Sequence, residues 1–246
     1  MTHSLFTATF RLACSQPRCP FCWMLEEDER RYMRSLLHEY TLAPDIHAHL
    51  AASAGFCARH AQVLVETEWA MERDGLGTAT LYESVLKQLE ATTAKALETS
   101  HKRPVLRKPE PNEMCERILV ALRPQETCLA CLHSRQNERF ALQSWVEYLS
   151  EEGLEADLAQ TYLQAWGVCF PHLLRLLEQR PSLEVARWLL NDFQTKLQQR
   201  RKRLEAYIHK HDVRHRHELR EEERHAWIEA VTLTVGDLLE RRGGML

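Results

Sequence analysis

The sequence is poor in the residues that interrupt helices. Its 246 residues include only 8 glycines and 9 prolines, whereas the helix-favouring residues Leu, Glu, Arg, Gln and Ala are abundant. Sandwiches and barrels depend on many short strands joined by turns, so this composition counts against both architectures. We therefore predict an all-α protein.

Long apolar segments and an excess of one charge are also missing. No stretch approaches the roughly 18 consecutive apolar residues that a membrane helix needs. The N-terminus lacks the basic segment of a signal peptide, and Arg11 interrupts its short apolar run. We predict a cytoplasmic protein that does not contact membranes. The net charge of −3 argues against nucleic-acid binding over the whole surface and permits a local basic patch.

Recognisable catalytic motifs are absent as well. The sequence holds no Gly-rich phosphate loop, no His-Glu-x-x-His motif and no arrangement typical of a nucleophile, a base and an orienting group. His211-Asp212 is a weak signal for acid–base chemistry, because adjacency in sequence does not place two side chains on one substrate. The question of an enzyme stays open here, and a non-enzymatic role is favoured.

The cysteines, in contrast, are numerous and patterned. Eight of them accompany 13 histidines. In a reducing compartment, patterned cysteines are more often metal ligands than disulfides. Two Cys-x2-Cys pairs and two Cys-x2-His pairs supply the candidate metal ligands, which are Cys19, Cys22, Cys57, His60, Cys128, Cys131, Cys169 and His172.

These motifs occur in the same order in two halves of the chain. An offset of 109 residues carries Cys19, Cys22 and Glu29 onto Cys128, Cys131 and Glu138. An offset of 112 residues carries Gly55, Cys57 and His60 onto Gly167, Cys169 and His172. A period this long indicates twin segments, not a solenoid. We predict an internally duplicated helical protein with about five helices per copy and a C-terminal helix, pinned by two Cys3His metal sites.

Helical periodicity and a proline-rich stretch divide the chain into four segments. We predict a first helical metal-binding repeat over residues 1–99, a Pro-rich linker over 100–112, a second repeat over 113–211 and a C-terminal extension over 212–246. The extension is expected to end in an amphipathic helix over about residues 220–241, whose apolar face carries Trp227, Ile228, Val231, Val235 and Leu238. Cys14 and Cys115 do not align between the copies and are expected to be core residues.

Three thiolates and one imidazole form a closed tetrahedral zinc site of the structural type. Cys-x2-Cys brings two thiolates together at a tight turn, and Cys-x2-His places its ligands on one face of a helix. We predict two Zn²⁺ ions per chain. An iron–sulfur cluster is the alternative, since thiolate-rich sites also suit iron. Which Cys-x2-Cys meets which Cys-x2-His stays open.

A basic and histidine-rich tract covers residues 196–217. Three readings of this tract stay open: a contact site for an anion such as a phosphate, a nucleic acid or an acidic partner, the solvated face of a long helix, or adventitious metal binding by its four alternating histidines. The sequence gives three functional hypotheses: a zinc-binding scaffold that binds an unknown protein partner, an iron–sulfur or thiol redox protein, and a nucleic-acid or phosphate binder acting through this tract.

The twin Cys-Pro-x-Cys … Gly-x-Cys-x2-His blocks, the Lys-His-Asp-x-Arg-x-Arg tract and the closing Trp-containing helix resemble an uncharacterised prokaryotic family. That family is a domain of unknown function (DUF 6062-like), and the resemblance covers nearly the whole chain. It implies a bacterial protein in which the eight candidate ligands form the motif core. It also singles out possible contact residues in the tract, which are Lys210, His211, Asp212, Arg214, Arg216 and Trp227. Leu129 and Leu219 depart from the family pattern at positions where proline is expected.

Overall fold

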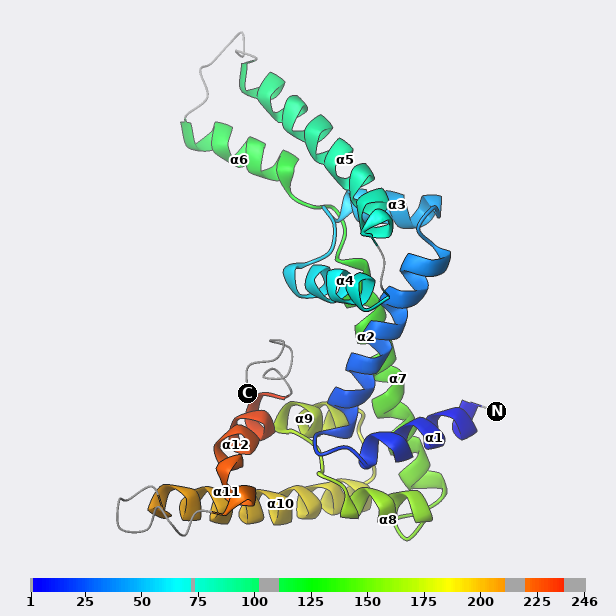
Figure 1. Cartoon of the computed structure of the whole chain (residues 1–246), viewed down its shortest axis with the longest axis vertical. Coiled ribbons are helices and arrows are strands. Elements are labelled where there is room, and N and C mark those ends of the chain that lie inside the picture. The colour runs from blue at the N-terminus through cyan, green and yellow to red at the C-terminus, as the bar shows by residue number, and fades with distance from the viewer. Residues whose placement is uncertain (1, 72–73, 102–110, 211–219, 237–246) are drawn as a thin grey trace. The chain divides into compact units, whose positions relative to one another are not determined.

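The chain folds into helices, as the computed structural model shows (Figure 1). The structure describes residues 2–71, 74–101, 111–210 and 220–236, and no strand occurs among them. The predicted all-α class is confirmed. No helix in these residues is both long and apolar enough to span a membrane.

Among the described residues, five helices precede the Pro-rich stretch and five follow it before the C-terminal pair. The first group is α1 (Thr2–Cys14), α2 (Pro20–Glu39), α3 (Pro44–Ala52), α4 (Ala58–Ala70) and α5 (Leu76–His101). The second is α6 (Pro111–Leu122), α7 (Leu129–Glu151), α8 (Asp157–Gln164), α9 (Phe170–Glu178) and α10 (Leu183–Lys210). The C-terminal pair is α11 (Glu221–Arg224) and α12 (Ala226–Val235). The duplication itself stays a prediction.

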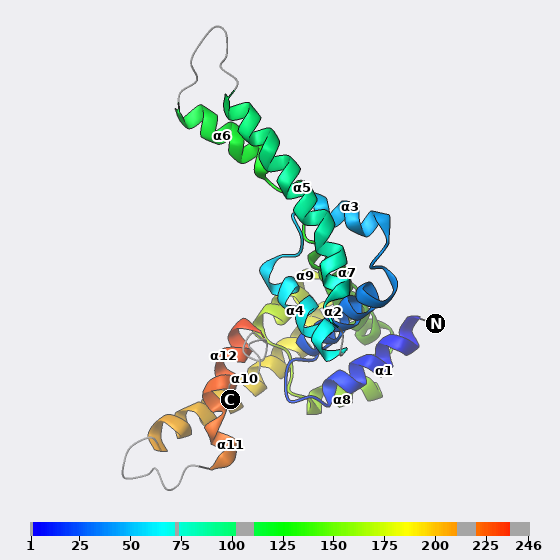
Figure 2. The same cartoon turned by 45° about the horizontal axis from the view of Figure 1, so that its top comes forward.

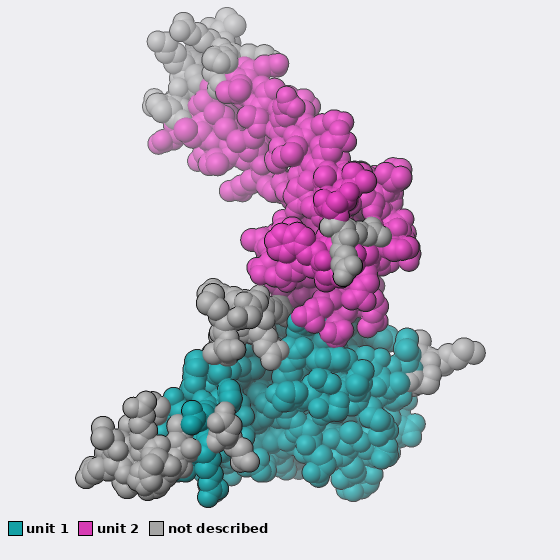
Figure 3. All heavy atoms as spheres, in the orientation of Figure 1, with its two compact units in different colours: residues 1–26, 137–246 teal, residues 27–136 magenta. Residues whose placement is uncertain are grey.

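The helices group into two compact units, coloured separately in Figure 3. Unit 1 comprises residues 1–26 and 137–246, and unit 2 comprises residues 27–136. The division falls inside α2 and α7, so each unit contains segments of both predicted repeats. The compact units and the predicted segments 1–99 and 113–211 are therefore different divisions of the chain.

Unit 1 has an aromatic core. Phe10 and Trp145 lie with ring centroids 4.4 Å apart, and Trp145 and Tyr162 with centroids 5.3 Å apart. Such tilted pairs add stabilisation beyond the burial of their surface. The wholly buried members of this core include Phe10, Phe21, Trp145, Leu149, Leu158 and Tyr162.

Unit 2 has a smaller core that is mostly aliphatic. Its buried apolar residues come from α2, α3, α4 and α5, with Cys128 and Ala130 at the start of α7, and they include Met33, Leu36, Leu37, Leu50, Leu64, Leu81 and Val85. Glu68, almost fully buried, accepts hydrogen bonds from the backbone N–H groups of Gly77 and Thr78 and so caps the start of α5.

Two predictions were wrong, the burial of Cys115 and the continuity of the C-terminal helix. Cys14 is buried as expected, but Cys115 is exposed on α6. The C-terminal helix is interrupted at His225, and α12 buries Ala226 and Leu233, which share the side of α12 that packs against α9 and α10. The residues predicted to form its apolar face are half exposed where the structure describes them, with Trp227 at 44%. The rest of that helix, 237–241, lies outside the described residues.

Candidate metal centres

The eight candidate ligands gather into two clusters, one in each unit. Site 1 consists of Cys19, Cys22, Cys169 and His172; site 2 consists of Cys57, His60, Cys128 and Cys131. In each cluster the four ligand atoms lie within 4.8 Å of one another. Each Cys-x2-Cys meets the Cys-x2-His of the other predicted repeat, which answers the question that spacing alone left open. Both clusters could hold a metal ion.

Each site lies where the N-termini of two helices meet. Cys57 and Cys169 are the N-cap residues of α4 and α9. Cys19 and Cys128 directly precede α2 and α7, and their carbonyl groups accept hydrogen bonds from residues 23 and 132. Because the first turn of a helix has unpaired N–H groups and a partial positive charge, it stabilises a thiolate at this position.

A glycine precedes each Cys-x2-His helix and allows the chain to turn toward the site. Gly55 and Gly167 both have φ of +89°, a conformation that L side chains rarely adopt. A side chain at Gly167 would also collide with Lys196, whose Cδ would lie 2.5 Å from the added carbon. The backbone geometry therefore favours glycine at residue 167, and any other residue there would also require the side chain of Lys196 to move.

In site 1, the imidazole faces the three sulfurs. The Nδ1 atom of His172 lies 3.5 Å from Cys19 Sγ, 3.4 Å from Cys22 Sγ and 3.1 Å from Cys169 Sγ. The sulfurs of Cys22 and Cys169 are 3.8 Å apart. All four ligands are buried, so water has little access to this cluster.

Site 2 repeats this arrangement with one difference. His60 Nδ1 lies 3.2 Å from Cys57 Sγ, 3.6 Å from Cys128 Sγ and 3.3 Å from Cys131 Sγ. The sulfurs of Cys57 and Cys131 are 3.7 Å apart. Cys57 and Cys131 are only half-buried, so this cluster is more open than site 1.

A glutamate faces the second ring nitrogen of each histidine. Glu138 Oε1 lies 3.0 Å from His172 Nε2, and Glu29 Oε1 lies 3.5 Å from His60 Nε2. Arg175 and Arg59 in turn form ion pairs with these two carboxylates. A carboxylate on the outer nitrogen fixes the tautomer of a metal-binding histidine and raises its basicity.

The two glutamates were not assigned a role from the sequence. The signal was present, because Glu29 and Glu138 align at the same offset as the Cys-x2-Cys pairs. Their positions in the sequence do not show which histidine each glutamate faces. The arginines carry no such signal, since Arg59 and Arg175 do not align with each other.

The side chains of site 2 shift one another's pKa values. Burial lowers the pKa of His60, but the Cys128 thiolate and Glu29 outweigh this effect and raise it to about 9. Burial together with the neighbouring Cys128 thiolate raises the pKa of Cys131 to about 12. Three sulfurs this close resist ionising together unless a cation offsets their charge, and a divalent metal ion supplies that charge.

The possible contact residues of the C-terminal tract are only partly described. Lys210 Nζ lies 2.7 Å from Glu223 Oε1, so its charge is neutralised within unit 1. Trp227 is half exposed on α12. The remaining four, His211, Asp212, Arg214 and Arg216, lie outside the described residues.

Comparison with protein families matches the chain to a family of unknown function, DUF6062, over residues 7–241. The chain belongs to this family. The matched range of this DUF6062 chain includes all eight ligands of sites 1 and 2, which confirms the resemblance noted from the motifs. Comparisons with curated proteins and with solved structures found no match.

Proposed function

We propose that this DUF6062 protein binds two Zn²⁺ ions, one in each Cys3His cluster. The spacing of the ligand atoms carries the proposal. A tetrahedral zinc ion with Zn–S bonds near 2.3 Å and a Zn–N bond near 2.0 Å places two sulfurs about 3.8 Å apart and a sulfur and a nitrogen about 3.5 Å apart. The sulfur–sulfur distances of 3.8 and 3.7 Å and the sulfur–nitrogen distances of 3.1–3.6 Å fit this geometry.

The same distances argue against the alternatives. A disulfide needs sulfurs about 2.05 Å apart, much closer than either pair here. An iron–sulfur cluster distributes its ligands over several iron atoms. Four ligand atoms within 4.8 Å of one another instead suit a single ion. The thiol redox and iron–sulfur hypotheses are therefore less well supported than zinc.

The role that follows from this geometry is structural. Four protein ligands complete a tetrahedral zinc ion and leave no position for water or a substrate, as in structural sites. Each ion would join two helix N-termini that are distant in sequence, α2 with α9 and α4 with α7. We propose a non-enzymatic scaffold or interaction protein that works in the reducing cytoplasm of a bacterium, where the thiols remain available to the metal.

A protein partner is better supported than a nucleic acid. Several basic residues of the tract on α10 are paired with acids: Lys196 with Asp192, Arg201 with Glu205, and Arg203 with Glu229. Cations that are already neutralised contribute little to phosphate binding. We therefore expect only weak and strongly salt-dependent binding of nucleic acid.

Elemental analysis with an absorbance spectrum tests the zinc proposal. We expect two zinc ions per chain in freshly purified, colourless protein. A thiol reagent at neutral pH should label one cysteine, the exposed Cys115, because burial raises the pKa of Cys14 to about 12 and the other six are metal-bound. Cys115→Ser is the control, with full zinc and no labelling. Less than one zinc per chain, or a brown protein containing iron, contradicts the proposal.

A further inference from the structure

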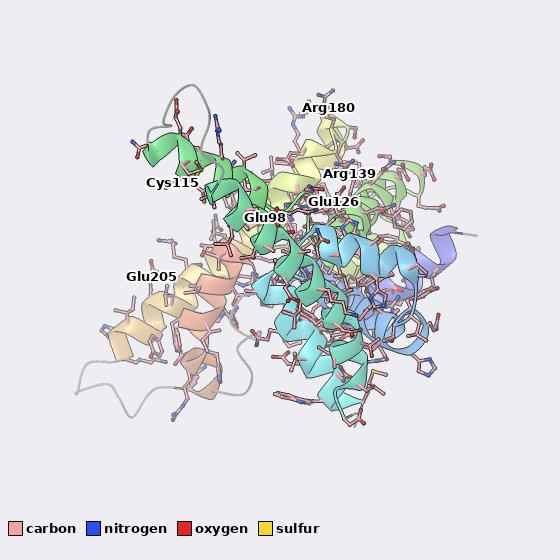
Figure 4. The ribbon with its side chains drawn as sticks, turned by 90° about the horizontal axis from the view of Figure 1, so that it is seen from above. Glu98, Cys115, Glu126, Arg139, Arg180 and Glu205 are labelled. Atoms are coloured by element: carbon pink, nitrogen blue, oxygen red, sulfur yellow. The ribbon has the colours of Figure 1, made fainter. Side chains whose placement is uncertain are left out.

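The helix α6 leaves its apolar side chains uncovered. It packs against α5, and Figures 1 and 2 show the two helices side by side. Leu119, Val120 and Leu122 are 56%, 70% and 40% exposed, and Cys115, labelled in Figure 4, is exposed beside them. A row of large apolar groups on one short helix is unusual for a surface without a partner.

In α1, the helix that aligns with α6, the corresponding apolar face is buried. The offset that relates the Cys-x2-Cys pairs carries Phe6, Phe10 and Ala13 onto Cys115, Leu119 and Leu122. The three α1 residues are almost fully buried in the core of unit 1. The three α6 residues lie on one side of their helix, at spacings of four and three residues, and are exposed.

The charges beside this face complement a second copy of the same helix. Glu116 and Arg123 are seven residues apart, so they flank the same side of the apolar row. The helical backbone continues to residue 123, whose N–H donates to the carbonyl of Leu119. When two such helices pair antiparallel about a point between Leu119 and Val120, Glu116 of each copy faces Arg123 of the other.

We propose that α6 is a self-association surface, which pairs antiparallel with α6 of a second copy of this chain. The pairing buries Cys115, Leu119 and Leu122 of both copies and forms two Glu116–Arg123 ion pairs between them. A stable interface buries about 800 Å² on each partner, more than one face of a twelve-residue helix supplies. The dimer is therefore reversible, with a Kd of about 1–100 µM. This inference goes beyond the zinc proposal and needs no particular metal.

Sedimentation of the full-length, metal-loaded chain over a range of concentrations tests whether the chain self-associates through α6. A reductant is present, so that disulfides through Cys115 cannot produce the dimer. We expect a monomer–dimer equilibrium whose Kd rises at least about tenfold in Leu119→Glu, because the new charge would be buried. Leu42→Glu, at a position of unit 2 that is 80% exposed, should leave the Kd unchanged. A monomer at every concentration, or a dimer indifferent to Leu119→Glu, overturns the proposal.

Charge reversal tests the antiparallel register. Glu116→Arg and Arg123→Glu should each weaken the dimer several-fold, because each places like charges opposite one another. The double variant should return to within about twofold of the wild-type Kd, because it restores both pairs in reversed order. Circular dichroism of each variant should match the wild type, since both positions are exposed. Failure of the double variant to recover excludes this register and overturns the proposal.

Discussion

The two candidate metal centres have the same set of Cys and His side chains in different surroundings. Site 1 lies against the aromatic core of unit 1, and all four of its ligands are buried. Site 2 adjoins a smaller aliphatic core, and two of its sulfurs are half-buried. The histidine–glutamate distance follows the same trend, at 3.0 Å in site 1 and 3.5 Å in site 2.

This difference separates what the ligands provide from what the surrounding protein provides. The ligands determine that an ion can bind, and they are alike in the two sites. The core determines how much of the fold survives without the ion and how quickly the ion leaves. Unit 1 has the larger apolar core and should need its metal less for folding, whereas unit 2 should depend on its metal.

The largest expected effect comes from removing one ligand in each site. Cys57→Ala should lose one zinc and much of the helix content of unit 2, because binding of a structural zinc contributes on the order of 10 kcal/mol and the small core cannot replace it. Cys169→Ala should also lose one zinc, but unit 1 should remain folded with a lower Tm. Elemental analysis and circular dichroism measure both outcomes.

Cys14→Ala is the matched control for Cys169→Ala, because it removes a buried sulfur of the same core that ligates no metal. It should keep two zinc ions. If Cys169→Ala lost more helix than Cys57→Ala, the cores would not account for the difference between the units.

The sequence singled out the eight Cys and His side chains that gather in the two clusters, but left their pairing open. Periodic apolar residues and the Cys-x2-Cys and Cys-x2-His motifs are local signals, and they identified the helices and all eight side chains. Whether Cys19 would meet Cys57 or Cys169 depends on packing between distant segments, which spacing does not record. The predicted burial of Cys115 was wrong for the same reason, because an apolar face on a helix does not show whether another part of the chain covers it.

A smaller effect, on zinc affinity, is expected when the glutamates that face the outer nitrogens of the histidines are replaced. Glu138→Gln should weaken zinc binding at site 1 by about 10- to 100-fold, because the amide holds the His172 N–H less strongly than a carboxylate does. Glu29→Gln should weaken site 2 by less, since Glu29 lies further from His60. Competition with a chromophoric chelator measures both affinities.

The exposed Glu147 on the same helix as Glu138 provides the control, and Glu147→Gln should leave both affinities unchanged. An equal loss in Glu29→Gln and Glu138→Gln would show that the longer distance in site 2 has no energetic consequence.

The smallest expected effect concerns a glycine that lies next to two sulfurs of site 1. Gly236 follows α12 with φ of +81° and ψ of −178°, a conformation open almost only to glycine. An added Cβ would lie 3.6 Å from Cys22 Sγ and 3.7 Å from Cys169 Sγ, which is ordinary contact. Gly236→Ala therefore adds backbone strain on the order of 1 kcal/mol without displacing a ligand.

We expect Gly236→Ala to keep two zinc ions and to release the ion of site 1 to a chelator about fivefold faster, because strain on the order of 1 kcal/mol weakens the cover over the two sulfurs. Gly153→Ala separates this effect from general strain. Gly153 also has a positive φ, of +89°, but a Cβ there would meet nothing within 4 Å. Gly153→Ala should lower the Tm by a similar amount and leave the release rate unchanged. Equal release rates in the two variants would mean that burial by α12 does not retain the metal, and the contrast between the sites would then rest on their ligands and glutamates alone.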